Sequence, residues 1–472
     1  MKFFNPYCNL CFLENFIRNS VDGFKKAAPR FELGIKDLQS SALPLGHAAD
    51  KDLLESFNYP NDKNHTILVI CNGHGEDIIA LEIIKRLQKK FKDKNIEVLP
   101  LVGKGDIFNS IEANKFRKIG FLKDLPSGGF SNQSIKGLFL DLFRGFLIDV
   151  FKNFLIVRGK SKHECKIIAI GDCLPLFFAW SSKCNFCFIG TPKSDFTWSS
   201  GPGWSISDLY HKFKGSEWDP WEMFFMKSPR CKTLIMRDEL TTNNLLRKKI
   251  NAKYFGNPMM DFVDKKNNKI STIIAFQRII LLIGSRFPEA LNNLDRFLDC
   301  LTDINLERDS LILLPLSINA DAIKIEGYLK KYGFSKEVGI EFMLGEDSIW
   351  KNNEKFILIG KGKFNSWASI ASVGLSNAGT ATEQITGLGI PSLSLPGLGP
   401  QFTKSFAKRQ SRLLGGSVIA CTNKKILLYH LNLLLKEKNI RFNQAKIGKK
   451  RMGTKGASQK IVDSINLNLL SW

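Results

Sequence analysis

Short runs of consecutive apolar residues alternate with helical patterns over most of the chain. The first run, Thr66 to Cys71, is apolar almost throughout, as a strand buried on both faces of a parallel sheet requires. A polar turn, Asn72 to Asp77, separates it from Ile78 to Phe91, in which apolar residues recur every four positions. The next predicted strands are Glu97 to Val102, Lys166 to Ile170, Phe186 to Ile189 and Thr233 to Met236. Alternation of this kind predicts an α/β fold with a doubly wound parallel sheet.

A second set of apolar runs follows the dipeptide Asn257-Pro258 and the polar stretch Asp264 to Lys269, which we interpret as an interdomain link. Its predicted strands are Ile279 to Ile283, Leu311 to Leu314, Phe356 to Ile359 and Pro391 to Leu395. Two such sheets in succession, with a cleft between them, suit a ligand that binds at the ends of the strands. We therefore predict two Rossmann-like domains, at residues 65–262 and 271–455, and a C-terminal helical segment at 456–472.

The first 64 residues differ from the rest of the chain, because they show no sustained periodicity. Within them, Ala27 to Ala49 resembles the peptide obtained by translating a tRNA gene on its opposite strand. We expect the natural start of translation to lie further downstream, near Leu53 or Leu54. No function is assigned to this irregular leader.

The chain is strongly basic, with 68 Lys and Arg residues against 45 Asp and Glu residues and a formal net charge of +23. Such an excess favours either a nucleic-acid face or attraction to an anionic bilayer. The basic residues are scattered and form no single tract, and an AT-rich coding sequence rich in Lys, Asn, Ile and Phe codons explains the excess equally well. We expect an anionic membrane surface as a partner and no nucleic acid.

One segment between the strands, Gly137 to Ile156, has a wide aromatic face at helical spacing. Its apolar positions are Phe139, Phe143, Phe146, Val150 and Phe154, and its charged positions on the other side are Asp141, Arg144 and Lys152. The charges make it a poor transmembrane span. It is either a buried helix of the first domain or a helix that lies on a membrane surface.

The ten cysteines are spread along the chain. Two C-x-x-C pairs occur, Cys8/Cys11 and Cys184/Cys187, but they are far apart in the sequence, so they do not form a zinc ribbon. We interpret the cysteines as buried thiols of a protein in a reducing cytosol. No secretory signal is evident in the first thirty residues or so, and we predict no metal site.

The segment Gly374 to Gln401 is the most informative stretch of the chain. It opens with small residues, enters a short helix-compatible segment and passes through Gly389-Ile390-Pro391 into an apolar strand. Small residues allow backbone N–H groups to approach a ligand, and a helix that begins there directs its positive dipole end at an anion. A pyrophosphate can be held in this way without a metal ion.

Several short motifs, taken in their order along the chain, point to one known family. They are Gly73 to Asp77, Gly256-Asn-Pro-Met-Met-Asp261, Ile280-Leu-Leu-Ile-Gly-Ser-Arg286 with Glu289, and Gly379-Thr-Ala-Thr382 with Gly389-Ile-Pro391. Together they resemble the lipid-A-disaccharide synthase family and its uncharacterised relatives, from about His65 to the end of the chain. The resemblance implies the GT-B architecture of two facing Rossmann-like domains. It also implies an inverting glycosyltransferase that uses a UDP-sugar and needs no metal or other cofactor.

The resemblance places the nucleotide-sugar in the second domain. Arg286 follows its strand through the turn Gly284-Ser285 and is a good diphosphate ligand, because its planar charge is permanent. Gly379 and Thr380 present backbone N–H groups, and Thr380 is a candidate N-cap. Gln401 is a candidate for hydrogen bonds to sugar hydroxyls. The competing structural interpretations are a surface salt bridge for Arg286 and a structural loop residue for Gln401.

Two departures from the family pattern matter. The family places a glutamate at the sixth residue of its GTATLE segment, where it holds the ribose, whereas here Glu383 comes one residue earlier and Gln384 takes that position. One residue is about 100° of helix rotation, so only one of the two can take the role, and we prefer Gln384. The family also has a GIDAPDF segment, and the matching text here keeps Asp172 but has Leu176 after the proline.

The general base is therefore open among three residues at predicted strand ends, Asp172, His74 and Asp77. An aspartate after a strand is often only a helix cap, which is the competing interpretation for Asp172 and Asp77. His74 lies between two glycines in an apolar neighbourhood, and its ordinary pKa suits proton transfer.

These expectations combine into one function and two alternatives. We predict a cytoplasmic enzyme, peripheral on the inner face of the plasma membrane, that transfers an acylated glucosamine from a UDP-sugar to a glycolipid acceptor in lipid A biosynthesis. The first alternative is another GT-B enzyme, with a different lipid acceptor or with UDP-sugar 2-epimerase activity. The second is a non-catalytic basic protein that binds a membrane surface and keeps the fold.

Overall fold

The computed structural model describes residues 66–470 except 74, 93, 111–115, 121–145, 161–164, 201–205, 264–272, 305–307, 319 and 398–401. Residues Asn64–Trp472 form one compact unit. The leader expected at residues 1–64, the interdomain link at Asp264 to Lys269, and the pair Cys8/Cys11 lie outside the described residues.

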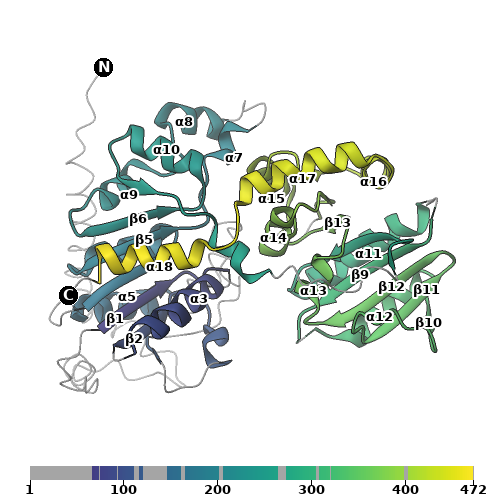
Figure 1. Ribbon diagram of the computed structural model, residues 1–472, viewed down its shortest axis with the longest axis horizontal. Helices are drawn as coiled ribbons and strands as arrows, with labels where there is room; N and C mark the ends of the chain where they lie inside the picture. The colour runs from purple at the N-terminus through teal and green to yellow at the C-terminus, as the bar shows by residue number, and fades with distance from the viewer. Residues whose placement is uncertain are drawn as a thin grey trace, which may run out of the picture. The chain divides into compact units, whose positions relative to one another are not determined.

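The first half of this unit is built on a parallel sheet of seven strands (Figure 1) in the order β3-β2-β1-β4-β5-β6-β7. Its strands are β1 (Thr66–Cys71), β2 (Asn95–Pro100), β3 (Arg117–Lys118), β4 (Cys165–Gly171), β5 (Asn185–Gly190), β6 (Cys231–Met236) and β7 (Ala252–Lys253). The order reverses between β1 and β4. In parallel sheets of this kind, ligands bind outside the carboxyl ends of the strands at such a reversal.

Helices cover both faces of the first sheet. They are α3 (Gly75–Lys90), η1 (Asp106–Ser110), α5 (Phe146–Gly159), α6 (Cys173–Ser181), α7 (Phe196–Ser199), α8 (Ile206–Lys214), α9 (Pro220–Met226), α10 (Glu239–Arg247) and η4 (Pro258–Phe262). In β1, Ile67 and Val69 face one core cluster and Leu68 and Ile70 face another. The continuous apolar run of this strand is therefore explained by burial on both faces.

The second half has an eight-stranded sheet in the order β10-β11-β12-β9-β8-β13-β14-β15. Its strands are β8 (Gln277–Leu282), β9 (Ser310–Leu316), β10 (Ser335–Glu337), β11 (Ser348–Asn352), β12 (Lys355–Lys361), β13 (Val373–Ser376), β14 (Ser392–Ser394) and β15 (Val418–Ala420). All neighbours are parallel except β10, β11 and β12, which pair antiparallel with one another at one edge. The order of the parallel strands reverses between β8 and β13.

Helices again lie on the faces of this sheet or close to its ends. They are α11 (Glu289–Asp303), α12 (Ala322–Lys331), α13 (Phe364–Ala368), α14 (Thr380–Leu388), α15 (Lys404–Leu414), α16 (Lys424–Lys436) and α17 (Lys438–Met452), whereas the last helix, α18 (Ala457–Asn468), packs elsewhere. Helices α14 and α17 approach closely through glycine, because a Cβ built on Gly448 comes within 2.5 Å of the Thr386 carbonyl oxygen. Any larger side chain at Gly448 would push α14 away from its present position.

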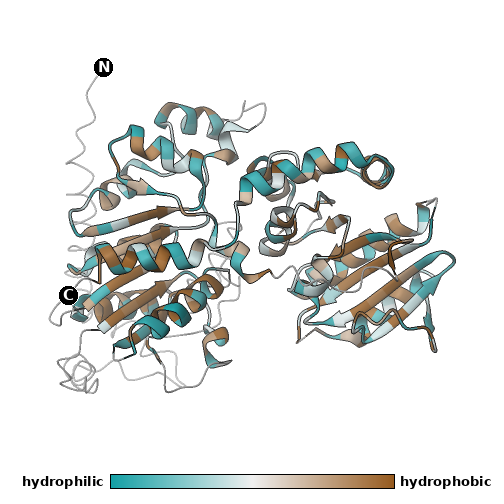
Figure 2. Cartoon of the chain, viewed as in Figure 1, coloured by the Kyte–Doolittle hydropathy of each residue, from teal (hydrophilic) through white to brown (hydrophobic). Residues whose placement is uncertain are grey.

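The last helix returns to the first half of the unit. Ile461, Val462 and Ile465 of α18 are fully buried in the same core cluster as β1 and α3. Figure 2 shows α18 and α3 side by side, each with hydrophilic residues on its outer surface, over the brown strands of the first sheet. This packing connects the end of the chain to the sheet with which the described chain begins.

The aromatic segment predicted at Gly137 to Ile156 is described from Phe146 onward, as helix α5. One of its faces packs on α6, where the rings of Phe154 and Phe177 stack with centroids 5.8 Å apart. The other face leaves Ile148, Phe151 and Leu155 between 43% and 60% exposed. The helix is thus buried on one side and open and apolar on the other.

Candidate functional site

The turns after β8 and β13 meet at the strand reversal of the second sheet. The Asn377 amide N–H donates to the Leu282 carbonyl over 2.9 Å, and a Cβ built on Gly284 would lie 3.4 Å from the Asn377 carbonyl oxygen. Gly284 has φ of +92°, which side-chain-bearing residues adopt only with strain. The predicted donor-site residues Gly284 and Gly379 are therefore carried by two neighbouring turns.

Two buried asparagines fix these turns. The Asn377 side chain donates to the Asn293 side chain over 2.9 Å and to the Leu395 carbonyl over 2.8 Å, and it accepts from the Leu395 N–H over 3.0 Å. Asn293 in turn donates to the Ile283 carbonyl over 3.0 Å. These hydrogen bonds hold the carboxyl ends of β8, β13 and β14 together. Sequence reasoning did not single out Asn293.

The N-cap position of α14 borders open space. Gly379 is the N-cap residue, it is exposed, and a Cβ built on it meets no atom within 4 Å. The Gln410 side chain donates to the carbonyls of Ala378 and Gly379 over 3.0 and 3.2 Å. The first N–H groups of a helix have no acceptor within the helix, so this end attracts an anion.

Arg286 and Ser285 lie on the neighbouring turn. Ser285 is exposed and Arg286 is half-buried. Burial lowers the pKa of the Arg286 guanidinium, and the nearby Glu289 carboxylate opposes that shift. Arginine stays charged at any physiological pH, so this turn, which neighbours the one leading into α14, carries a permanent positive charge. Glu289 itself is held in place, because it accepts the Phe402 N–H over 2.8 Å.

The strand reversal of the first sheet gathers a second group of polar residues. Glu76 follows β1, Asp172 follows β4, Thr191 follows β5 and Arg237 follows β6. The Thr191 hydroxyl donates to Glu76 Oε1 over 3.0 Å, and the Thr191 carbonyl accepts from Arg237 Nη1 over 2.9 Å. Sequence reasoning missed Glu76, Thr191 and Arg237, although Arg237 follows its strand much as Arg286 follows β8.

The two groups meet at the N-termini of two helices. A Cβ built on Gly75, the first residue of α3, would lie 3.1 Å from the Thr380 hydroxyl, at the first residue of α14. Beside this junction, Arg237 Nη2 binds Glu383 Oε2 over 2.7 Å, and both side chains are largely buried. The turn that carries Glu76 therefore lies directly against the helix end that is open to an anion.

Two of the three predicted catalytic residues, Asp172 and Asp77, are described by the structure, and their surroundings differ. Asp172 caps α6, since its side chain accepts the Leu174 N–H over 3.1 Å. Asp77 is 4% exposed within the first turn of α3. His74 lies outside the described residues. A role of any of the three as general base remains a prediction, and Asp172 has the capping role that was its competing interpretation.

The two candidates for the ribose contact are both engaged within the protein. Glu383 is bound to Arg237, and the Gln384 side chain is buried and donates to the Met259 carbonyl over 3.3 Å. The preference for Gln384 is not supported by this placement, because its amide packs against η4. Gln401 lies outside the described residues, and its contact with the sugar stays a prediction.

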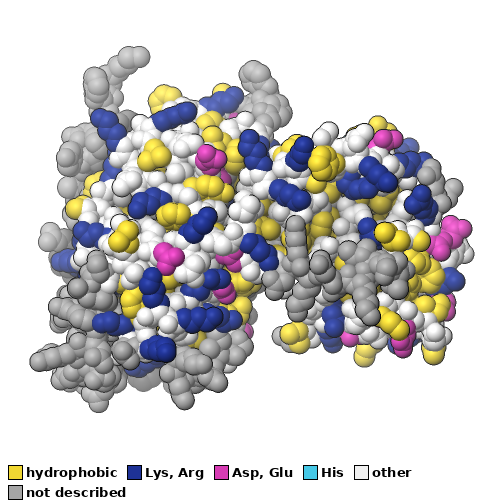
Figure 3. Space-filling view, in the orientation of Figure 1, with side chains coloured by type: hydrophobic (Ala, Val, Ile, Leu, Met, Phe, Trp, Pro, Cys, Tyr) yellow, Lys and Arg dark blue, Asp and Glu magenta, His cyan; other side chains and the backbone are white. Residues whose placement is uncertain are grey.

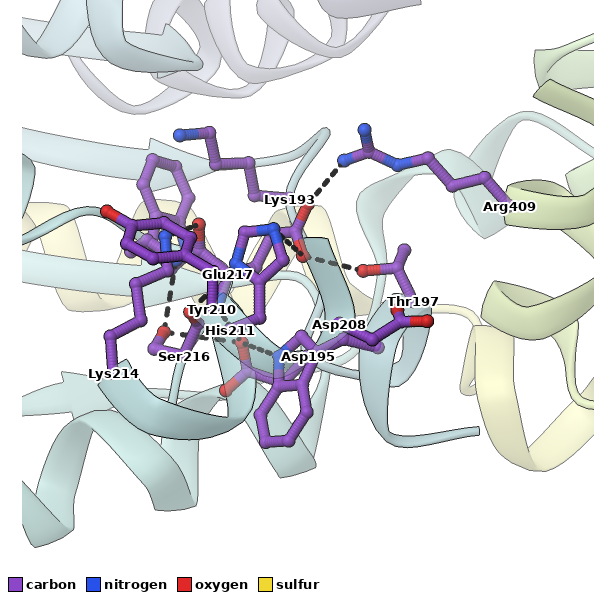
Figure 4. Close-up of polar contacts among 12 residues, drawn as sticks. Lys193, Asp195, Thr197, Asp208, Tyr210, His211, Lys214, Ser216, Glu217 and Arg409 are labelled. Carbon is purple, nitrogen blue, oxygen red and sulfur yellow. Dashed lines mark hydrogen bonds and ion pairs between the residues drawn. The ribbon is translucent and has the colours of Figure 1, made fainter. Parts of the chain in front are cut away.

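Helix α15 connects the donor side with the first half of the unit (Figure 4). Arg409 binds Glu217 over 2.6 Å, and Glu217 also accepts from the Thr197 hydroxyl over 2.8 Å. Arg412 binds Asp208 over 2.8 Å. The helix that supplies Gln410 to the carbonyls before α14 is thus tied by ion pairs to the segment after β5.

Comparisons with known proteins agree with this architecture. A calicheamicin glycosyltransferase matches with a TM-score of 0.55 and 11% identity, over 86% of this chain and 99% of its own. A UDP-glucose:anthocyanidin 3-O-glucosyltransferase in complex with UDP matches with 0.53 and 13%, over 86% and 100%. A protein from Listeria monocytogenes named as a UDP-N-acetylglucosamine 2-epimerase matches with 0.51 and 14%, over 85% and 96%. The chain has the GT-B fold.

These likenesses are structural, because the identities are low. No family model matches the sequence, and no curated protein matches it either. The GT-B fold confirms the predicted fold class of two Rossmann-like α/β domains. The membership in the lipid-A-disaccharide synthase family remains a prediction.

The part of the chain that the structure describes contains no cluster of three or more His, Cys, Asp or Glu side chains arranged around a possible metal position. Within the described ranges, none of the helices combines the length and apolar character of a membrane span. The cysteines described by the structure are free thiols; Cys173 and Cys231 are partly exposed, and the others are buried, as predicted: Cys71, Cys165, Cys184, Cys187, Cys300 and Cys421.

Proposed function

We propose that this protein is an inverting glycosyltransferase of the lipid-A-disaccharide synthase type. It transfers an acylated glucosamine from a UDP-sugar to a glycolipid acceptor, as expected for a step of lipid A biosynthesis. The observation that carries the proposal is the open N-terminus of α14, with Gly379 exposed and Arg286 on the adjacent turn. The similar structures include one that holds UDP, which supports a UDP-sugar as the donor.

The two halves of the site divide the chemistry. In the donor half, the N–H groups at the start of α14 and the Arg286 guanidinium stabilise the negative charge that grows on the departing UDP. In the first half, a base at the strand reversal takes the proton of the attacking acceptor hydroxyl. The junction of Gly75 with Thr380 brings these two functions together. The protein groups replace a metal ion in this scheme, and no cofactor is required.

The donor site is tested by replacing Arg286. Arg286→Ala is expected to weaken UDP binding by roughly 10- to 100-fold, because a charge-assisted hydrogen bond contributes about 1.5–3 kcal/mol. Isothermal calorimetry measures the affinity. Arg278→Ala is the matched control, since Arg278 is also a half-buried arginine but lies near the start of β8, where it binds Ser372, whereas Arg286 follows the end of that strand. Equal UDP affinity in the wild type and Arg286→Ala contradicts the assigned site, and absence of UDP binding in the wild type leaves only a non-catalytic binding protein.

The reaction is tested by mass spectrometry of products formed from a UDP-diacylglucosamine and an acylated sugar phosphate. A disaccharide product supports the transferase. The fold is shared with a protein named as an epimerase, so the UDP-sugar is also incubated alone. Inversion at C2 of the sugar without an acceptor establishes the 2-epimerase alternative and overturns the proposal.

We further propose that the enzyme works on the cytoplasmic face of the plasma membrane, against anionic lipid. Helix α8 leaves Leu209 and Tyr210 about half exposed and Phe213 92% exposed, with Lys212 exposed among them. Figure 3 shows Lys and Arg side chains spread over the visible face, with fewer acidic ones. An apolar helix face flanked by basic residues suits an anionic interface.

The membrane contact is expected to depend on Phe213. The wild-type protein should sediment with phosphatidylglycerol vesicles and far less with phosphatidylcholine vesicles, and Phe213→Ser should lower the bound fraction several-fold because it removes an exposed aromatic anchor. Ile323→Ser is the control, since Ile323 is a similarly exposed apolar residue, 82% exposed, on α12. Equal binding to both vesicle types would show that the basic surface has no part in the contact.

A further inference from the structure

Glu76 differs from the other carboxylates at the carboxyl edge of the first sheet in both position and surroundings. It lies in the first turn of α3, immediately after Gly75, on which a Cβ would lie 3.1 Å from the Thr380 hydroxyl. The turn that carries it needs glycine at position 73, where φ is +95° and a Cβ would come within 2.6 Å of the Val102 carbonyl oxygen. The Glu76 N–H donates back to the Gly73 carbonyl over 3.2 Å, which closes this turn. The position of Glu76 against α14 is therefore fixed by the backbone.

The surroundings of Glu76 raise the pKa of its carboxyl group toward neutral pH. The pKa of Glu76 is raised to about 7, chiefly by burial; the neighbouring Asp172 and Asp77 carboxylates contribute to the rise, whereas the backbone N–H of Glu76 and the Thr191 hydroxyl oppose it by hydrogen bonding to the carboxylate. Glu76 and Arg237 also interact electrostatically, and Arg237 is bound to Glu383. A carboxylate with a pKa near the working pH is suited to general-base catalysis.

Asp172 and Asp77 are less suited to act as the general base. Asp172 is committed to the cap of α6, and Asp77 is 4% exposed inside the first turn of α3. Glu76 is partly exposed, as Asp172 is, but it caps no helix and lies on the turn that meets Thr380 of α14. We propose that Glu76 is the general base of the transfer reaction, positioned by Thr191. This inference rests on the proposed function and names the residue that the family resemblance left open.

The transfer step forms one bond, breaks one bond and moves one proton. The acceptor hydroxyl oxygen forms a bond to the anomeric carbon of the donor sugar, and the bond from that carbon to the β-phosphate oxygen breaks. UDP leaves with the electron pair of the broken bond, toward the N-terminus of α14. The hydroxyl proton passes to the ionised carboxylate of Glu76, and the anomeric centre is inverted.

The test combines one substitution that removes the base with two that shift its pKa in opposite directions. Glu76→Gln is expected to lower kcat about 100-fold, the low end of the range for general-base catalysis, and to abolish the rise of rate with pH near 7. UDP affinity by calorimetry should stay within a few-fold of the wild type. Glu82→Gln is the matched control on the same helix, where Glu82 binds Arg86 over 2.7 Å, and it should behave as the wild type.

The pKa-shifting variants keep the glutamate in place. Thr191→Val has nearly the same shape but lacks the hydroxyl that donates to Glu76, so the rise of rate with pH should move to higher pH. Asp172→Asn removes a neighbouring negative charge and still caps α6, so the rise should move to lower pH. A residue with only a structural role would produce neither shift.

The possible outcomes distinguish a wrong assignment of the base from a wrong proposed function. A wild-type rate and pH profile in Glu76→Gln overturns the assignment of the base and leaves the transferase intact. Loss of both the activity and the rise of rate with pH in Asp172→Asn, with both kept in Glu76→Gln, assigns the base to Asp172 instead. Absence of sugar transfer by the wild-type protein removes the proposed function and the base with it.

Discussion

Replacing Gly379 by aspartate is expected to weaken UDP binding by two to three orders of magnitude. The new carboxylate would lie at the N-cap of α14, where the diphosphate is proposed to bind. Two unit charges about 4 Å apart near a protein surface interact by roughly 4 kcal/mol, so repulsion of this size offsets most of the attraction of the helix end. The substitution fits sterically, because a Cβ at Gly379 meets no atom within 4 Å.

Gly379→Asn is the matched control for this prediction. Asparagine has the same shape as aspartate, and both are good N-cap residues, so the folding effects of the two variants should be similar. The difference in UDP affinity between them then reports the charge alone. Calorimetry at low and high salt provides the measurement, and equal affinities in the Asp and Asn variants would show that the diphosphate does not bind at this helix end.

The second large effect is expected at the ion pair of Arg237 with Glu383. Their side chains are only 4% and 13% exposed and the atoms lie 2.7 Å apart, so removing one partner leaves a buried charge uncompensated. Arg237→Met should therefore lower the free energy of unfolding by about 3–5 kcal/mol, the range found when one partner of a buried pair is removed. Urea unfolding measures it.

The double variant Arg237→Met with Glu383→Leu decides the reason for this loss. Replacing both members of a buried pair by apolar residues is often nearly neutral, so the double variant should recover most of the stability. A cost of less than about 1 kcal/mol for Arg237→Met alone would place the pair among exposed salt bridges and contradict its burial.

The strands of the parallel sheets could be predicted from the sequence because burial on both faces leaves a continuous apolar run. The run of Thr66 to Cys71 gave β1 with the bounds that the structure has. The predicted strand Glu97 to Val102 lies two residues late at both ends relative to β2, because Leu101 and Val102 extend the apolar run past Pro100. The edge strand β10 is polar and exposed, so its residues carry no such pattern.

The turns and the helix proposed to hold the donor could also be located from the sequence, because their signal is local, and their role in binding stays a prediction. A glycine-rich turn followed by a helix, and an arginine after a strand, are contiguous in the sequence. The first half was harder, since the raised pKa of Glu76 depends on Thr191 and Asp172, which are distant in sequence and meet only at the strand reversal. Arg237 was missed for the same reason, because its partner Glu383 comes from the second half.

The central claim is that the N-terminus of α14 holds the diphosphate of the donor without a metal ion. A crystal structure of the protein with UDP, grown in the presence of a chelator, tests it most directly. The account predicts phosphate oxygens within hydrogen-bond distance of the backbone N–H groups at Gly379 and Thr380, with the Arg286 guanidinium beside them. Density for UDP elsewhere, or binding that appears only after a divalent cation is added, would contradict it.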